Sequence, residues 1–291
     1  MIKALITTYF PDTSVVKNAS IIKSQVDELF ICDNSPVSNE ALFAPILDGP
    51  NVHYIPYLEN LGLSGAFNRV LTDTSLNWNP DDYIVFFDQD STIEQAHIAN
   101  LVAEYEALRQ AGHNVGCLGP VFFNRSNNTV EIPHQKQPLN DHSYSVGSTI
   151  TSSLLCTYQT LQEIAFWNEQ VFLDMADWDL CWRIMATGKL CCMTDTVVLN
   201  HALGNGEKRV GPLRVRVGAP IREYYQTRDC LYLLSKPYAP IKYKIRFLAM
   251  LTVRPVLHLL VLDDKKKRFH YIKRGFADFF KHKHAAFSQE K

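Results

Sequence analysis

Short apolar, β-prone runs alternate with helix-forming segments along the first two hundred residues, and this alternation restricts the possible folds most. An amphipathic helix is predicted over 94–111, because its apolar residues recur at helical spacing. The predicted strands are 4–8, 29–32, 52–55, 83–87, 115–120 and 197–200. Strands that alternate with helices favour a mostly parallel sheet covered on both faces. We therefore expect an α/β fold.

Polar residues stand at or just after the ends of several predicted strands. These residues are Thr8, Asp33, Asn60 and Asp88. In parallel sheets of this kind, ligands bind beyond the carboxyl ends of the strands. The shared position predicts a binding site at that edge. Asp33 also has a simpler interpretation, because Asp-Asn-Ser-Pro is strong turn chemistry.

The stretch 84–92, Ile-Val-Phe-Phe-Asp-Gln-Asp-Ser-Thr, places two carboxylates, Asp88 and Asp90, directly after an apolar run. If the extended backbone continues, alternate residues share a face and both carboxylates point the same way. Hard oxygen ligands suit Mg²⁺ or Mn²⁺ that carries a phosphate-bearing ligand. A strand that merely ends in a polar turn is the alternative.

Other nucleotide-binding motifs are missing from the expected places. No G-x-G-x-x-G loop follows the first strand, and no Walker A lysine loop occurs. A nucleotidyltransferase would need a glycine-rich loop with Arg or Lys there, and residues 7–11 do not provide one. The small residues at 60–68 instead predict a helix that begins close to a ligand, where free N–H groups favour anions.

A second acidic cluster, Asp174, Asp177 and Asp179, precedes a predicted helix that stops at Gly188. One aspartate at a helix start is often only a cap worth about 1 kcal/mol. Three carboxylates within six residues are costly to gather unless a cation or a proton is shared. We therefore expect a catalytic base in this cluster.

Further polar candidates follow the last predicted strand. His201 comes directly after it, and such an imidazole can complete an oxygen-rich Mn²⁺ site, although a solitary His is more often a packed or surface side chain. A basic run comes next, which is either a solvated face or a clamp on a departing diphosphate. Its members are Lys208, Arg209, Arg214, Arg216, Arg222 and Arg228. The hydroxyl-rich run 146–157 is either a buried strand or a wall of an acceptor pocket.

Charge divides the chain at residue 236. Residues 236–291 hold 14 Lys/Arg and 4 Asp/Glu, whereas residues 1–235 hold 15 and 26. We expect a catalytic domain over 1–235 and a basic helical extension over 236–291. Aromatic residues interleave with the basic ones, which is typical of an interfacial helix on anionic lipid. A solvated face is the simpler interpretation, and RNA binding is a third one that we do not expect.

The cysteine pattern indicates the compartment. Seven Cys occur without a C-x-x-C pair, and no secretory signal is evident at Met1. We expect a cytoplasmic protein, either free or peripheral on the inner face of the plasma membrane. The longest apolar stretch, 247–262, is too short and too interrupted to predict a membrane span.

Several short residue strings of this chain together resemble family 2 glycosyltransferases of the GT-A fold. Within that family they resemble the bacterial rhamnosyltransferase-like group. The resemblance covers about residues 1–234. The most discriminating strings are Asp88-Gln89-Asp90-Ser91 and the stretch from Phe172 to Arg183. The remaining strings are Ile6-Thr7-Thr8-Tyr9, Asp33-Asn34-Ser35, Asn60-Leu61-Gly62 with Asn68, His201-Ala202-Leu203-Gly204 and Tyr224-Tyr225-Gln226-Thr227-Arg228-Asp229.

The resemblance implies a role for each matching residue. Thr8 and Asp33 would contact the nucleoside, with Asn60 near them, and Asp88 would approach the ribose or the metal. Asp90 would bind the metal, Mn²⁺ or Mg²⁺, and His201 would complete its coordination. Asp177 would be the general base, with Asp174 and Asp179 supporting it, and Arg228 would lie near the diphosphate.

The resemblance implies an inverting transfer, with L-rhamnose from dTDP-rhamnose as the best match, to a glycan or lipid-linked glycan in cell-surface polysaccharide synthesis. A UDP-hexose or galactofuranose donor stays open, as does a non-catalytic nucleotide-sugar or glycan-binding module. Two departures stand out. The usual Ser-Gly reads Ser152-Ser153, which would reshape the acceptor pocket, and the usual Arg-Asn reads Arg228-Asp229.

Overall fold

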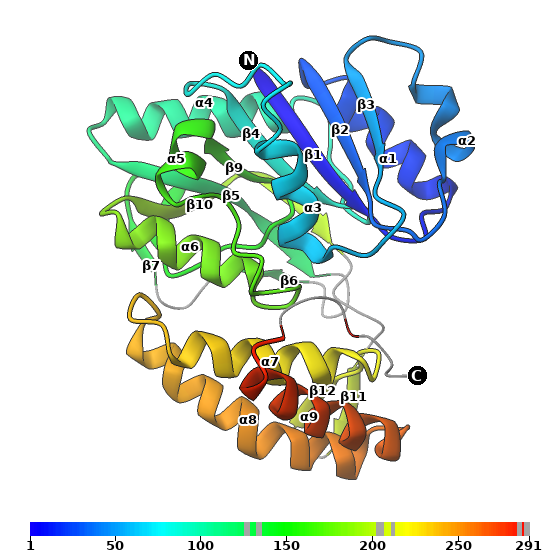
Figure 1. The fold of residues 1–291 in the computed structure, drawn as a ribbon. Helices are drawn as coiled ribbons and strands as arrows, with labels where there is room; N and C mark the ends of the chain where they lie inside the picture. Colours follow the sequence, from blue (N-terminus) through cyan, green and yellow to red (C-terminus); the bar gives the residue numbers. More distant parts are fainter. Residues whose placement is uncertain (125–128, 132–135, 202–206, 211–212, 284–286, 288–291) are drawn as a thin grey trace.

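The computed structural model describes residues 1–291 except 125–128, 132–135, 202–206, 211–212, 284–286 and 288–291 (Figure 1). Its strands are β1 Ile2–Thr8, β2 Glu28–Asp33, β3 Val52–Pro56, β4 Tyr83–Asp88, β5 Val115–Asn124, β6 Thr129–Glu131, β7 Lys136–Pro138, β8 Ser143–Val146, β9 Leu154–Thr157, β10 Leu190–His201, β11 Glu207–Val210 and β12 Leu213–Arg216. Its helices are α1 Thr13–Lys23, α2 Glu40–Phe43, the 3₁₀ turn Ala44–Ile46, α3 Gly62–Leu71, α4 His97–Gln110, α5 Tyr158–Glu163, α6 Ala176–Ala186, α7 Arg222–Leu234, α8 Ile241–Val261 and α9 Lys265–Phe280.

Within these residues a ten-stranded sheet has the order β3-β2-β1-β4-β9-β5-β10-β8-β7, with β6 beside β5. Strands β3, β2, β1 and β4 are parallel, as predicted. Strand β9 then inserts antiparallel between β4 and β5, and β10 runs parallel to β5. The α/β class is confirmed. The sheet is parallel in its first half and mixed in its second.

Helices cover both faces because side chains along each strand alternate between two cores. On β1, Ala4 and Ile6 belong to one core and Leu5 to the other. Helices α1 and α4 supply the first core, and α3 and α6 the second. The helix predicted over 94–111 is α4, and its stripe Ile98, Leu101, Tyr105 and Leu108 is buried.

Helices α7, α8 and α9 lie together below the sheet and its helices (Figure 1). A buried ionic cluster joins all three. Glu223 on α7 accepts hydrogen bonds from Arg268 on α9 at 3.0 Å, and it lies 2.6 Å from His258 Nδ1 on α8. Each of these side chains is at most 6 % exposed. Helix α7 is thereby tied to the segment 236–291, across the predicted boundary at residue 235.

Candidate active site

The ends of β1, β2 and β4 bring three of the predicted polar residues to one edge of the sheet. In the parallel ladders Thr8 is the register partner of Asp33, and Thr7 is that of Asp88. Neighbouring parallel strands are about 4.8 Å apart, so the three strand ends lie close together, with Thr8 and Asp33 on one face of the sheet and Asp88 on the face of Thr7. The fold therefore brings these three residues to one edge, and their predicted roles in binding stay predictions.

Thr8 and Asp33 differ in how their polar atoms are used. Thr8 is buried, and its Oγ1 has no hydrogen-bond partner among the described residues. Asp33 is fully buried, and its carboxylate accepts from Asn39 Nδ2 at 2.8 Å, Tyr54 OH at 2.6 Å and Ser35 N at 3.0 Å. Burial acts to raise the pKa of Asp33, but these hydrogen bonds together lower it. Asp33 is therefore a carboxylate at neutral pH.

The start of α3 is a packing junction. Asn60 Oδ1 accepts the Gly62 N–H at 3.0 Å, and the Leu63 N–H donates to Phe172 O at 2.9 Å. Gly62 has φ +73°, and a Cβ there would lie 2.6 Å from Phe172 O. Two of the N–H groups expected to attract an anion are therefore bonded to the protein. The glycine permits close approach of the segment that leads to α6.

Asp88 and Asp90 do not share a strand face. Strand β4 ends at Asp88, and the Ser91 N–H donates to Asp88 O at 3.1 Å, which closes a turn. Of the two possibilities left open by the sequence, the structure shows the polar turn, and the extended backbone does not continue to Asp90. Asp90 is exposed. Both carboxylates still stand at the ligand-binding edge.

Ser152 orients Asp88. The fully buried Ser152 Oγ donates to Asp88 Oδ2 at 2.7 Å and lies 2.8 Å from Ser91 Oγ. Next to it, Ser153 has φ +63°, a left-handed conformation that favours glycine. His97 Nε2 lies 2.7 Å from Ser153 Oγ, and burial lowers the pKa of His97 to about 4, so its ring is neutral. The sequence predicted Ser152 on the acceptor side, whereas its side-chain hydrogen bonds described above are with the Asp88 turn.

The three aspartates at 174–179 have different partners. Asp174 accepts a hydrogen bond from Arg222 Nε at 3.0 Å. Asp179 is fully buried, and Arg183 Nε donates to it at 2.7 Å. Asn168 and Tyr238 occupy the other carboxylate oxygen of Asp179. Asp179 therefore fixes α6 in place.

Asp177, in the first turn of α6, is half-buried and has no salt bridge within the described part of the chain. The Trp178 N–H donates to its Oδ1 at 2.8 Å. Burial raises the pKa of Asp177 well above its ordinary value, and the negative charges of Asp88 and Asp174 raise it further. A carboxylate in this setting readily accepts a proton.

Arg222 is the cation beside these carboxylates. Its hydrogen bonds to Asp174 raise the pKa of the guanidinium, and Asp88 contributes as well. In the sequence Arg222 was one member of a basic run, and no local signal singled it out. Its partner lies 48 residues away in the chain.

Arg228 lies inside the protein. It is fully buried, donates from Nε to Asp229 Oδ1 at 2.8 Å, and has the Tyr224 and Tyr225 rings 5.2 and 5.4 Å away. Asp229 Oδ2 in turn accepts the Phe172 N–H at 3.0 Å. The Arg228–Asp229 pair therefore holds the segment that precedes α6, and Asp229, the residue that departs from the family pattern, makes the contact.

His201 is the last residue of β10, and its backbone is the register partner of Asn124 on β5. The side chains of His201, Lys208, Arg209, Arg214 and Arg216 lie outside the described residues. Their predicted roles stay predictions.

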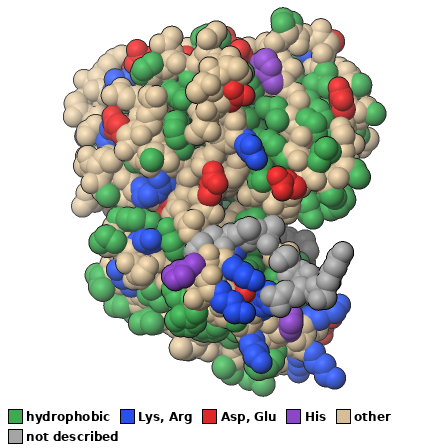
Figure 2. Space-filling model, viewed as in Figure 1, with side chains coloured by type: hydrophobic (Ala, Val, Ile, Leu, Met, Phe, Trp, Pro, Cys, Tyr) green, Lys and Arg blue, Asp and Glu red, His purple; other side chains and the backbone are tan. Residues whose placement is uncertain are grey.

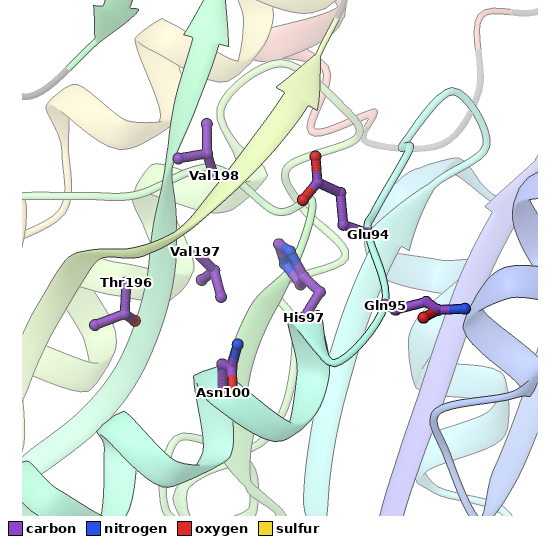
Figure 3. A pocket seen from close by; sticks show the side chains of 7 residues that line it. All are labelled: Glu94, Gln95, His97, Asn100, Thr196, Val197 and Val198. Carbon is purple, nitrogen blue, oxygen red and sulfur yellow. The ribbon is translucent and has the colours of Figure 1, made fainter.

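A separate cavity of about 420 Å³ lies beside the first turn of α4 (Figure 3). Its lining side chains come from the segment before α4, from α4 itself and from β10. They are Glu94, Gln95, His97, Asn100, Thr196, Val197 and Val198. None of the predicted site residues lines it. His97 links it to the Asp88 turn through Ser153.

The mixed sheet, the polar strand ends and the helix that carries Asp177 define a transferase of the GT-A type. The family model described as glycosyl transferase family 2 matches residues 13–159, about half of the chain. The chain belongs to this family and is a glycosyltransferase that uses a nucleotide-sugar donor.

Two similar proteins extend the comparison. The chain is 25 % identical over 289 residues to "dTDP-rhamnosyl transferase RfbF" of Shigella flexneri, covering 94 % of this chain and 92 % of that protein. The fold also matches a crystal structure of GalNAc-T7 with UDP, GalNAc and Mn²⁺, with a TM-score of 0.55 and 14 % identity. That match covers 97 % of this chain, which spans 56 % of the neighbour's length. The second likeness supports the fold.

Proposed function

We propose that this chain transfers L-rhamnose from dTDP-rhamnose to a hydroxyl of a glycan or lipid-linked glycan, with inversion at the anomeric carbon. Similarity along nearly the whole length of a protein named for dTDP-rhamnosyl transfer supports the donor. The observation that carries the chemistry is Asp177 in the first turn of α6, a half-buried carboxylate whose pKa is raised by burial.

In the proposed reaction Asp177 removes the proton of the acceptor hydroxyl. The hydroxyl oxygen forms a bond to the anomeric carbon, and the bond from that carbon to the diphosphate oxygen breaks with its electron pair. Proton transfer to a positioned carboxylate contributes about 10²- to 10⁴-fold to such rates. In this proposal Thr8 and Asp33, which are register partners at neighbouring strand ends, hold the nucleoside.

A divalent cation fits the residues at the end of β4. Asp88 and Asp90 offer oxygen ligands suited to Mg²⁺ or Mn²⁺, and Ser152 already orients the Asp88 carboxylate. Asp88 and Asp174 both act on Asp177, so negative charge accumulates there. When bound, the ion would neutralise charge on the leaving diphosphate. EDTA should stop turnover, and Mn²⁺ or Mg²⁺ should restore it. Activity unaffected by EDTA would refute the assignment of Asp90 and His201 as metal ligands.

A panel of nucleotide sugars tests the donor. We expect dTDP-rhamnose to raise the melting temperature and to be hydrolysed slowly by the full-length protein, with UDP-hexoses and UDP-galactofuranose as the competing donors. Preference for a UDP-sugar would show that rhamnose is not the donor sugar, and the proposed transfer mechanism would still hold. Binding without hydrolysis or transfer of any donor would favour a non-catalytic module.

We further propose that α8 rests on an anionic membrane surface, where a lipid-linked acceptor would be presented. Exposed apolar side chains of α8 recur at helical spacing on one side of the helix. This α8 apolar face consists of Ile241, Ile245, Leu248, Val253, Val256 and Leu260, each 55–74 % exposed. No described helix is long and apolar enough to cross a membrane.

Charge complementarity favours lipid as the occupant of the α8 apolar face. Apolar and basic side chains gather over the helical part of the molecule (Figure 2), and residues 236–291 hold 14 Lys/Arg against 4 Asp/Glu. Basic residues near a surface of anionic lipid contribute about 1 kcal/mol each. The opposite side of α8 packs on α6. There Trp178 and Trp182 of α6 contact Tyr243 and Phe247 of α8.

Point variants test the membrane surface better than truncation, because the Glu223 cluster ties α8 and α9 to α7. The triple variant Ile245→Ser, Leu248→Ser, Val256→Ser should lower partitioning onto phosphatidylserine vesicles about tenfold. Val37→Ser, which removes a valine that is 60 % exposed outside α8, is the matched control. Equal binding of the triple variant and the control to the vesicles would contradict the proposal that the α8 apolar face contacts the membrane.

A further inference from the structure

Three cysteines from three different elements converge in the core beneath α6. They are Cys117 on β5, Cys181 on α6 and Cys191 on β10, and each is fully buried. Their Sγ atoms all lie within 4.8 Å of one another. These thiols take no part in the transfer reaction proposed above.

Sheet register explains the convergence. Cys117 and Cys191 are register partners on the parallel strands β5 and β10, and Cys156 on β9 is the partner of Cys117 on its other side. The three side chains therefore form a row across the sheet, on the face that α6 covers with Cys181. Cys192, the next residue of β10, belongs to the core on the opposite face.

Buried cysteines often act only as small apolar side chains. That role does not require several sulfur atoms to meet. A polar atom also reaches this position, because Cys181 Sγ lies 3.9 Å from Thr149 O. A cluster of thiols with adjacent polar atoms is suited to coordinate a soft cation.

We propose that Cys117, Cys181 and Cys191 bind a thiophilic metal ion, Zn²⁺ in the first instance, with Cys156, the register partner of Cys117, as the candidate for a fourth position. Tetrahedral zinc has Zn–S bonds of about 2.3 Å, which sets S–S separations of about 3.8 Å. Sγ atoms within 4.8 Å reach that geometry by small side-chain rotations. On binding, each ligating thiol releases its proton to solvent and becomes a thiolate.

This site differs from the carboxylates at the end of β4 in both chemistry and role. Thiolates select soft ions, whereas Asp88 and Asp90 suit Mg²⁺ or Mn²⁺. Cys181 lies four residues after Asp177, one turn along α6. An ion bound by the three thiolates would tie that turn to β5 and β10 and so hold the Asp177-bearing helix on the sheet. The inference does not depend on the identity of the sugar.

Metal content tests the proposal directly. The full-length protein, purified under reducing conditions from zinc-supplemented cells and then dialysed against EDTA, should retain about one zinc ion per chain by elemental analysis. Cys191→Ala should lower zinc retention at least about tenfold, and so should Cys181→Ala. Cys192→Ala is the matched control, because it removes an equally buried neighbouring thiol from the other face and should leave zinc content unchanged.

A wild-type measurement keeps the test decisive if the alanine variants fail to fold. Protein refolded with equimolar Zn²⁺ should carry zinc through gel filtration and release it when a mercurial reagent modifies its thiols. Wild-type protein that is folded but zinc-free after both preparations would overturn the proposal, as would retention of zinc by the Cys181→Ala variant. Either result would leave the cysteines as core side chains.

Discussion

Asp177 and Asp179 lie two residues apart in the first turn of α6, yet they face different surroundings. Asp179 is fully buried and bonded to Arg183, Asn168 and Tyr238. Asp177 has a raised pKa and lies near Asp88 and Asp174. Asp179 therefore holds the helix in place, whereas Asp177 is a carboxylate whose protonated form is favoured by its surroundings. The same substitution at each position separates these roles.

The largest expected effect is the loss of transfer in Asp177→Asn. The amide cannot accept the acceptor proton, so kcat/KM should fall about 10³-fold, while the dissociation constant for the donor stays within about twofold of wild type. Steady-state kinetics and donor titration measure the two quantities. Full activity in this variant would refute the assignment of the base.

Asp179→Asn should act on stability. It leaves the partly buried Arg183 guanidinium without its anionic partner, and breaking an ion pair whose carboxylate is fully buried costs about 3 kcal/mol of unfolding free energy. Urea unfolding measures the loss. The pH profile of the remaining activity should match wild type; a displaced profile would mean that Asp179 takes part in proton transfer.

Arg222→Gln should lower activity at neutral pH about tenfold and move the acid limb of kcat/KM to higher pH. The reason is that the charges of Asp174 and Asp88 lose their nearby cation and raise the pKa of Asp177 further. Activity requires the deprotonated base, so it rises as pH rises through that pKa. Arg109→Gln, which removes an exposed arginine paired with Glu106, should leave the profile unchanged.

At neutral pH, Asp177→Asn should stabilise the fold, which is the opposite sign to Asp179→Asn. The folded-state pKa of Asp177 lies above its unfolded value. Below the unfolded value the carboxyl is protonated in both states and has no penalty; above the folded value the full penalty applies. The gain in melting temperature should therefore shrink as pH falls toward 3.8, the ordinary aspartate pKa. A gain independent of pH would contradict a charge effect.

The smallest expected effect is at Ser153, whose φ of +63° favours glycine. Urea unfolding should find Ser153→Ala less stable than Ser153→Gly by about 1 kcal/mol, because both variants lose the contact with His97 and only alanine retains the left-handed strain. At Ser143, a buried residue of β8, the order should reverse. The same order at both positions would show that backbone conformation is not the cause.

Much of the architecture could be predicted because its signals are local. The parallel strands β1 to β4 and the buried stripe of α4 follow from residue spacing, and the polar strand ends meet because parallel strands end at one edge. The sequence left open whether the chain turns or stays extended after Asp88, because one backbone hydrogen bond between Ser91 and Asp88 decides between the two. The mixed second half of the sheet depends on how β9 pairs, which its short sequence does not reveal.

The sequence by itself determined the α/β class, the edge where we propose that ligands bind and the cluster that contains the proposed base. Only the tertiary structure decided which carboxylate keeps a raised pKa, that Arg222 rather than Arg228 faces the site, and that Ser152 orients Asp88. It also brought together Cys117, Cys181 and Cys191. The physical reason is that periodicity and turn chemistry act between near neighbours, whereas charge partners and burial depend on residues distant in sequence.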